Sequence, residues 1–162
     1  MSERRDALKY FLELPVLRTL HKADIEANIP HRDPFLLVDE VNVLEENKKY
    51  VGIKHVRPDE YYFKGHFPQK PVMPGVLIVE TISQAFGGAI MRQIADKGGL
   101  PLFLSIDNAK FRGMVVPGDT LEMPIEIIRL GKISKIYAEA YVKGKLCTQA
   151  SLTFILGENL HA

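Results

Sequence analysis

The segment GHFPQKPVMPGVLIVE, residues 65–80, connects a proline-rich loop to the longest apolar run of the chain. This run extends from Val76 to Met91, and its length and composition predict a helix that begins after the Pro-Gly pair of the segment. Glu80 lies in the first turns of the predicted helix, and the run contains no lysine or arginine. A buried carboxylate without a charged partner is costly or takes up a proton. Glu80 is therefore a candidate for a chemical role.

The overall composition indicates how many domains the chain forms and which classes of binding partner it can have. The chain has 162 residues, of which 46% are hydrophobic, and this suits one domain with a substantial core. The formal net charge of +1 argues against nucleic acid as the main partner, because phosphate binding requires a strong basic excess. The one cysteine, Cys147, excludes an internal disulfide and is typical of a reducing compartment.

The sequence contains no stretch typical of a targeting signal or of a membrane span. Residues 1–9 are highly charged, and the apolar residues that follow are interrupted by charged side chains and by Pro15. The run at 76–91 is short for a membrane-spanning helix and contains Glu80. We therefore expect a cytoplasmic protein without a membrane span.

Around the long helix, the sequence predicts two shorter helices and a series of strands. Apolar residues recur at helical spacing within residues 2–14, and a second short helix is expected at 24–28. The glycine pair at 98–99 is expected to end the long helix. Alternating or β-branched segments predict strands at residues 35–43, 50–56, 102–106, 110–116, 120–130, 135–142 and 146–156.

This order of elements predicts an α+β fold, in which a strongly curved antiparallel sheet wraps around the long helix. The predicted helix is apolar on nearly all sides, so most of its surface must be covered by other parts of the protein. One small sheet cannot cover it alone. We therefore expect a dimer or a larger assembly.

Glu80 shares one face of the predicted helix with Gln84, Gly87 and Gly88. The Gln84 amide can hold the carboxyl group or a nearby water by a hydrogen bond. The two glycines leave room for a partner backbone or for a long ligand. A buried polar pair beside glycines that serve close packing explains the helix equally well.

His66 and Gly75 add two further chemical functions close to Glu80 in the sequence. A histidine titrates near neutral pH and can act as a general base. Gly75 stands where the helix should begin, and unpaired backbone N–H groups at a helix N-terminus can stabilise an oxyanion. A base, an acid and an oxyanion donor together suit proton abstraction next to a carbonyl group, followed by loss of a leaving group.

Three motifs of the sequence resemble those of the FabZ-type (3R)-hydroxyacyl-[acyl-carrier-protein] dehydratases of bacterial type II fatty acid synthesis. They are Gly-His-Phe-Pro followed by Pro-Gly-Val-Leu-Ile-Val-Glu at 65–80, Pro-His-Arg with Pro-Phe-Leu-Leu-Val-Asp at 30–39, and Lys-Phe-Arg with Pro-Gly-Asp at 110–119. The similarity covers about residues 23–155. It divides the chain into an N-terminal extension at 1–21, which we expect to be helical, and a dehydratase domain at 22–162.

The resemblance implies a hot-dog fold and a homodimer, commonly assembled into a hexamer, with the active site at the dimer interface. The family's catalytic histidine matches His66, its catalytic glutamate matches Glu80, and its backbone donor to the thioester oxygen matches Gly75. The substrate is carried on the phosphopantetheine of acyl carrier protein, and no further cofactor is needed. In the related FabA-type dehydratase/isomerases an aspartate occupies the glutamate position, so Glu80 favours the FabZ type.

The expected reaction is loss of water from a (3R)-3-hydroxyacyl thioester to give the trans-2-enoyl thioester. The acyl chain is expected to follow the stripe on the face of the helix beyond Glu80, so Gln84, Gly87, Gly88 and Met91 are candidate substrate-binding residues. Phe67, next to His66, is a further candidate for substrate binding. Lys110 and Arg112 are candidates for contact with the acidic carrier protein or with the phosphate of its phosphopantetheine, although a solvated strand face is an equally good interpretation of these two residues.

Two departures from the family pattern leave the preferred acyl-chain length open. Asp33 stands where the family usually has tyrosine, and residues 82–84 read Ile-Ser-Gln in place of Met-Ala-Gln. The histidines outside the 65–80 segment show no metal-ligand spacing, so no metal site is expected, and His31 is interpreted as a loop anchor. The alternative functions are a FabA-like dehydratase/isomerase, a hot-dog thioesterase, or a non-catalytic scaffold that binds acyl carrier protein.

Overall fold

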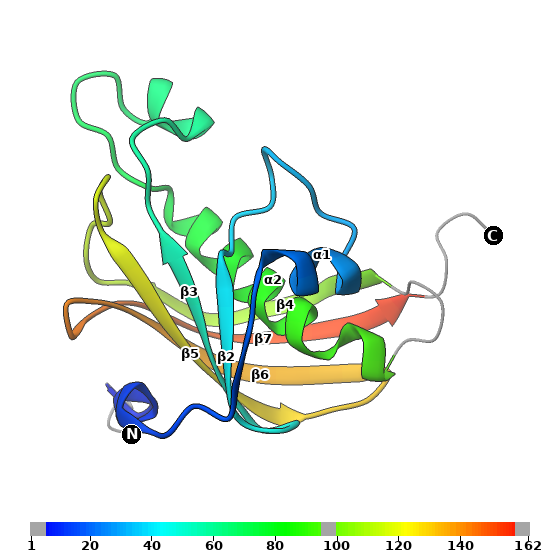
Figure 1. Ribbon diagram of the computed structural model, residues 1–162. Coiled ribbons are helices and arrows are strands. Elements are labelled where there is room, and N and C mark those ends of the chain that lie inside the picture. Colours follow the sequence, from blue (N-terminus) through cyan, green and yellow to red (C-terminus); the bar gives the residue numbers. More distant parts are fainter. Residues whose placement is uncertain (1–5, 95–99, 158–162) are drawn as a thin grey trace.

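The computed structural model describes residues 6–94 and 100–157 (Figure 1). The helical elements are η1 (Lys9–Glu13) and η2 (Tyr61–Lys64), which are 3₁₀ helices, and the α-helices α1 (Lys22–Asn28) and α2 (Gly75–Ile94). The strands are β1 (Arg18–Leu20), β2 (Glu40–Glu45), β3 (Lys49–His55), β4 (Leu100–Phe111), β5 (Thr120–Arg129), β6 (Ile133–Val142) and β7 (Lys145–Gly157).

The described strands form one antiparallel sheet that curves around α2. Its order is β1-β2-β3-β5-β6-β7-β4, so β1 and β4 lie at the two edges. Figure 1 shows α2, in green, crossing one face of the sheet, and α2 contacts β2, β3, β4, β5 and β7. This arrangement confirms the predicted α+β class, and it has the layout of the hot-dog fold.

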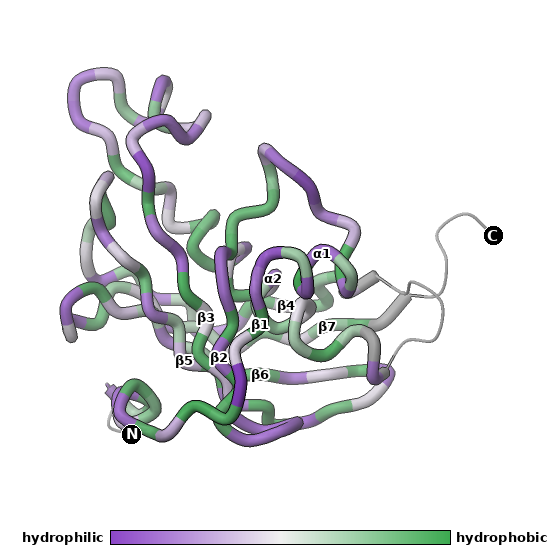
Figure 2. Tube along the Cα trace, in the orientation of Figure 1, coloured by the Kyte–Doolittle hydropathy of each residue, from purple (hydrophilic) through white to green (hydrophobic). Residues whose placement is uncertain are grey.

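The main hydrophobic core fills the space between α2 and the sheet. Phe86 and Ile82 of α2 are fully buried there, and Phe86 stacks on Phe154 of β7 with ring centroids 5.0 Å apart. A Cβ atom at Gly52 of β3 would lie 2.8 Å from the Cβ atom of Ala85, so a glycine is needed for this close approach of helix and strand. Figure 2 shows hydrophobic residues along α2 and alternating hydropathy along the strands.

The long helix agrees closely with its predicted bounds. It begins at Gly75, one residue before the apolar run, and continues beyond Met91 to Ile94. The expected stop at residues 98–99 lies outside the described residues. Within the described part of the chain, no helix is both long and apolar enough to cross a membrane.

Several predicted strands differ from those in the structure. The strands expected at 102–106 and 110–116 are parts of one strand, β4, which ends at Phe111 and contains two register irregularities. The strand expected from residue 35 starts only at Glu40. The preceding residues instead form a turn, because the N–H groups of Phe35 and Leu36 both donate to the Arg32 carbonyl oxygen.

The N-terminal segment packs on the face of the sheet that is turned away from α2. Gly52 faces α2, so the neighbouring Val51 faces the other side, where it packs with Leu8 and Phe11. The helix predicted within residues 2–14 is present only as the 3₁₀ helix η1, and residues 1–5 lie outside the described part. The proposed extension at 1–21 also contains β1, which pairs with β2 and was not predicted.

Glu139 of β6 holds this N-terminal segment in place. Its carboxylate is fully buried and accepts hydrogen bonds from the backbone N–H groups of Ala7 at 3.2 Å and Leu8 at 2.7 Å. The hydroxyls of Tyr137 and Tyr141 donate to the same carboxylate at 2.6 and 2.9 Å. Burial and the hydrogen bond to Glu139 raise the pKa of Tyr141 above its ordinary range, so this hydroxyl stays a donor.

Candidate active site

His66 lies in the loop between η2 and α2, and its own backbone shapes that loop. Its N–H donates to the carbonyl oxygen of Tyr62 at 3.0 Å, and its carbonyl oxygen accepts from the N–H of Val72 at 3.0 Å. The ring is partly buried and stacks on Phe67, with centroids 4.1 Å apart and planes 24° apart. Phe67 itself is half exposed. The imidazole is therefore held in place while one side remains accessible.

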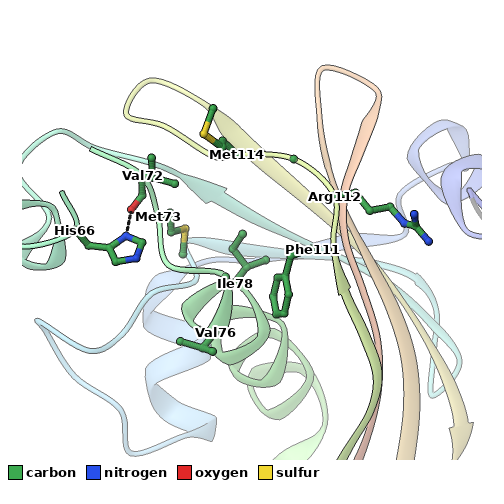
Figure 3. A pocket seen from close by; sticks show the side chains of 10 residues that line it. His66, Val72, Met73, Val76, Ile78, Phe111, Arg112 and Met114 are labelled. Carbon is green, nitrogen blue, oxygen red and sulfur yellow. Dashed lines mark hydrogen bonds between the residues drawn. The ribbon is translucent and has the colours of Figure 1, made fainter. Parts of the chain in front are cut away.

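The hydrogen bond of the His66 ring determines which nitrogen is free. Nδ1 lies 2.7 Å from the carbonyl oxygen of Val72, an atom that can only accept a hydrogen bond (Figure 3). Nδ1 must therefore carry a proton, and in the neutral ring Nε2 is the bare nitrogen. His66 thus presents a lone pair on Nε2, as a general base requires.

A buried ion pair anchors the loop that carries His66. Nζ of Lys54 lies 2.6 Å from Oε1 of Glu60, and the two side chains are only 3% and 8% exposed. Lys54 also donates to the carbonyl oxygen of Leu37 at 2.9 Å, and Glu60 accepts from the N–H of Arg57 at 2.9 Å. Because Glu60 directly precedes η2, this pair connects the His66 loop to β3 and to the segment around Leu37.

His66 borders an open cavity of about 570 Å³ that is mainly apolar. The cavity lies at the N-terminal end of α2, between the His66 loop and the segment that follows β4 (Figure 3). The residues that line it are His66, Val72, Met73, Gly75, Val76, Ile78, Phe111, Arg112, Gly113 and Met114. An apolar cavity with a histidine at its edge can accommodate a hydrocarbon chain next to a base.

Gly75 is the first residue of α2, and its backbone N–H donates no hydrogen bond to any residue of the described chain. The free N–H groups of a first helical turn carry partial positive charge. A Cβ atom at this position would lie 2.5 Å from the ring of Phe111. A glycine is therefore needed for the contact between the helix start and the Phe111 ring that lines the cavity.

Glu80 lies one helical turn beyond Val76 and does not line the His66 cavity. Its side chain is 19% exposed, and Oε1 accepts a hydrogen bond from Nε2 of Gln84 at 3.0 Å. Nε2 of His31 lies 3.5 Å from the same oxygen. Among the described residues, no hydrogen bond or ion pair joins His66 to Glu80. In a single chain, the predicted base and the predicted acid therefore do not line the same cavity.

Gln84 is almost completely buried, and both ends of its amide are used. Oε1 accepts from the N–H of Leu37 at 2.7 Å, and Nε2 donates to the carbonyl oxygen of Phe35 at 2.8 Å as well as to Glu80. The hydrogen bond from Leu37 determines the orientation of the amide, so its nitrogen must face Glu80. Gln84 thus connects the acid to the loop before β2.

Gly87 and Gly88, which the sequence predicts to line the path of the acyl chain, are covered by other residues of the same chain. A Cβ atom at Gly88 would lie 2.9 Å from Cγ2 of Ile25 in α1, and one at Gly87 would lie 3.0 Å from Cγ2 of Ile29. Met91 is 2% exposed and belongs to the core. This packing favours the second interpretation of the stripe, in which the glycines allow α1 and α2 to approach closely.

The two candidate carrier-protein residues lie near the end of β4. Nε of Arg112 donates to Oε1 of Gln149 at 2.9 Å, and Figure 3 shows the Arg112 side chain on the side of the cavity away from His66. Lys110 is the second-last residue of this strand and is partly buried. A role in recognition stays a prediction for both. No group of side chains suited to a metal ion occurs in the described residues.

Two residues of the site were not predicted. In the sequence, Phe111 belongs only to the Lys-Phe-Arg motif, yet in the structure its ring covers Gly75. The sequence predicts only a loop-anchoring role for His31, yet in the structure Nε2 of its ring lies 3.5 Å from Oε1 of Glu80. Both contacts join segments that are far apart in the sequence, and no local pattern marks them.

The family model of the FabA-like domain matches residues 29–151. The chain belongs to the FabA-like family. A FabZ 3-hydroxyacyl-[acyl-carrier-protein] dehydratase of Desulforamulus reducens is 48% identical over 135 residues, which cover 83% of this chain and 95% of that protein. The corresponding FabZ of Clostridium kluyveri is 47% identical over 136 residues, or 83% of this chain and 94% of that protein. The resemblance to FabZ-type proteins is thereby confirmed.

Solved structures confirm the hot-dog fold of this FabA-like protein. The dehydratase heterocomplex ApeI:P from Xenorhabdus doucetiae superposes with a TM-score of 0.71 at 18% identity, over 83% of this chain and 91% of that chain. A hypothetical thioesterase from Streptococcus pneumoniae, solved with coenzyme A, has a TM-score of 0.52 at 13% identity, over 74% of this chain and 90% of that chain. At such low identities the likeness concerns the fold alone.

Proposed function

We propose that this protein is a 3-hydroxyacyl-[acyl-carrier-protein] dehydratase, a hydro-lyase of fatty acid biosynthesis. FabZ dehydratases nearly half identical to it over most of its length support this activity. The observation that carries the proposal is the Nδ1 hydrogen bond of His66 to Val72, which leaves Nε2 as a bare base at the edge of an apolar cavity. The substrate is a (3R)-3-hydroxyacyl thioester, and the product is the trans-2-enoyl thioester.

The proposed mechanism consists of proton transfers alone. The thioester carbonyl oxygen accepts a hydrogen bond from the Gly75 N–H, where the partial positive charge of the helix N-terminus stabilises developing negative charge. Nε2 of His66 takes the proton from C2 of the acyl chain, and the electrons of that C–H bond form the double bond between C2 and C3. The C3–O bond breaks as the Glu80 carboxyl gives its proton to the departing hydroxyl, which leaves as water.

The reaction requires no redox or metal step, because the oxidation state of the acyl chain as a whole does not change. The proton on His66 must then leave and Glu80 must regain one before the next turnover. The substrate would be presented on the phosphopantetheine of acyl carrier protein, with Lys110 and Arg112 as candidate contacts. The cytoplasmic location expected from the sequence stays a prediction that follows from this pathway.

A complete site is proposed to form between two copies of the chain. Glu80 does not line the cavity of His66, so a partner subunit's acid is needed to face the base. The edge strand β4 supports a second copy, since its side chains Phe103, Leu104 and Ile106 are exposed. An exposed apolar edge strand favours pairing with another chain. Sedimentation at micromolar concentration should show a dimer or hexamer, and a folded monomer would contradict the shared site.

One assay separates the proposed reaction from its alternatives. Purified protein is mixed with a trans-2-enoyl thioester or with its 3-hydroxyacyl partner, and enoyl absorbance and free thiol are followed together. Interconversion without thiol release supports the dehydratase, thiol release indicates a thioesterase, and formation of the cis-3-enoyl product indicates an isomerase. If the protein binds acyl carrier protein but catalyses none of these reactions, it is a scaffold and the proposal is overturned.

The same assay tests the assignment of the acid. Glu80→Gln keeps the side-chain shape but cannot deliver a proton, so its turnover should fall by roughly two to four orders of magnitude. A folded Glu80→Gln variant that keeps more than about a tenth of the wild-type activity would remove Glu80 from the mechanism.

A further inference from the structure

Two side chains converge on one oxygen of the Glu80 carboxyl group. Gln84 donates from Nε2 to Oε1 at 3.0 Å, and Nε2 of His31 lies 3.5 Å from the same atom. No hydrogen bond or ion pair from the described residues reaches Oε2. The two oxygens of this carboxyl group are therefore in different environments: one is held by the protein, and the other is left available.

We infer that His31 is a positioning residue that acts through Glu80. It holds Oε1 as a hydrogen-bond acceptor, so that the proton given to the departing hydroxyl resides on Oε2. This inference rests on the proposed function, because it assigns His31 a part in the delivery of that proton. The assignment follows from these contacts: Oε1 accepts a hydrogen bond from Gln84 and has Nε2 of His31 3.5 Å away, so it is the carbonyl-like oxygen of a protonated carboxyl group.

The loop around His31 is built to keep the ring in this position. The Arg32 guanidinium donates to the carbonyl oxygens of Glu26, Ile29 and His31 at 3.0, 2.9 and 2.7 Å, which ties the loop to the end of α1. The His31 ring also stacks on Phe35, with centroids 6.4 Å apart and planes 17° apart. The backbone and the ring of His31 are thus both fixed in position. A group that orients another side chain must itself be fixed in this way.

The second nitrogen of His31 supports the same assignment. Nδ1 is buried and has no hydrogen-bond partner in the described part of the chain. A buried N–H without an acceptor is costly, so a proton on Nδ1 is disfavoured. The neutral ring then carries its proton on Nε2, and this is the nitrogen that faces Oε1 of Glu80. His31 therefore directs an N–H toward Oε1 of Glu80, whereas His66 presents a bare nitrogen to the substrate.

Three substitutions distinguish the effect of the His31 N–H donor from the effect of its aromatic ring. His31→Phe keeps an aromatic ring against Phe35 but removes the donor, and His31→Leu removes both. His31→Gln keeps a donor, because its amide nitrogen can reach the place of the imidazole Nε2. We expect both donor-free variants to lower kcat for dehydration by about 10- to 100-fold with KM little changed, the scale of a misplaced catalytic group. His31→Gln should keep most of the wild-type kcat.

The decisive measurement combines His31→Phe with Glu80→Gln. If His31 acts only through the acid, the double variant should be no slower than Glu80→Gln alone. The inference is overturned if a folded donor-free variant with the wild-type Tm keeps the full kcat, if His31→Gln loses as much as His31→Phe, or if the two losses add in the double variant. An inactive wild type would instead overturn the proposed function and this inference with it.

Discussion

Nδ1 of His66 lies 2.7 Å from the carbonyl oxygen of Val72, and this contact assigns the imidazole tautomer without reference to any ligand. Because the carbonyl can only accept, the proton of the neutral ring resides on Nδ1, and Nε2 is free to take another. The loop closes on itself around this contact, since the N–H of Val72 donates back to the carbonyl oxygen of His66.

His66→Asn separates the anchoring role of the ring from its chemistry. The asparagine amide can donate to the Val72 carbonyl oxygen as Nδ1 does, but nothing replaces Nε2. Turnover should fall by roughly two to four orders of magnitude, the scale of a positioned general base, while Tm stays close to that of the wild type. His66→Ala should lose as much activity and also some stability. An Asn variant with near-normal kcat would show that Nε2 is not the base.

Gly75→Ala should disturb the site without unfolding the protein. Its Cβ atom would lie 2.5 Å from the Phe111 ring, and this half-exposed ring must swing into or away from the cavity. We expect kcat/KM to fall by about tenfold or more, because a displacement near the oxyanion donor misplaces the thioester. Gly65→Ala is the matched control, since a Cβ atom there would meet nothing within 4 Å. Equal activities of the two variants would contradict the prediction.

Gly88→Leu tests whether the glycine stripe serves packing or the acyl chain. A Cβ atom at Gly88 already lies 2.9 Å from Ile25, so a leucine should force α1 away from α2 and destabilise the fold by about 1–3 kcal/mol. Activity should then fall for short and long hydroxyacyl substrates alike. The measurement compares Tm and kcat/KM across chain lengths. A selective loss for long chains at unchanged Tm would restore the tunnel interpretation expected from the sequence.

Lys54→Met should be strongly destabilising. Its ammonium group and Glu60 are both buried, so removal of the lysine leaves an uncompensated carboxylate, at a cost of about 3–5 kcal/mol. Urea unfolding at one fixed protein concentration measures the effect. Arg18→Met is the control, because Arg18 and Glu46 form a similarly short pair, at 2.8 Å, whose side chains are 45% and 47% exposed. That change should cost only about 0–1 kcal/mol, and similar losses for both would refute the argument.

Glu139→Gln should loosen the N-terminal segment. The amide that replaces the carboxylate can no longer accept all four hydrogen bonds, so at least one of its buried donors loses its partner, at a cost of about 1–3 kcal/mol. Amide hydrogen exchange at Ala7 and Leu8 should accelerate. The exposed Glu45 of β2 serves as the control position for the same substitution. Unchanged protection at both amides would show that Glu139 does not hold the segment.

The sequence by itself predicted the parts of this protein that depend on local patterns. The long helix follows from apolar periodicity over a single run, and its start follows from the Pro-Gly pair before it. The candidate base, acid and oxyanion donor lie within sixteen consecutive residues, 65–80, so one motif contained all three. The strands from residue 120 onward were also predicted closely, because turn residues separate them.

Only the tertiary structure decided the contacts between distant segments. The three-residue strand β1 has no pattern of its own and exists because β2 pairs with it. Two of the partners of Glu139, the backbone N–H groups of Ala7 and Leu8, lie more than a hundred residues away in the sequence. The packing of α1, α2 and β4 also determines three contacts of the site. These are His31 with Glu80, Ile25 with Gly88, and Phe111 with Gly75. Such contacts are determined by close packing in three dimensions, and the periodicity of the sequence does not predict them.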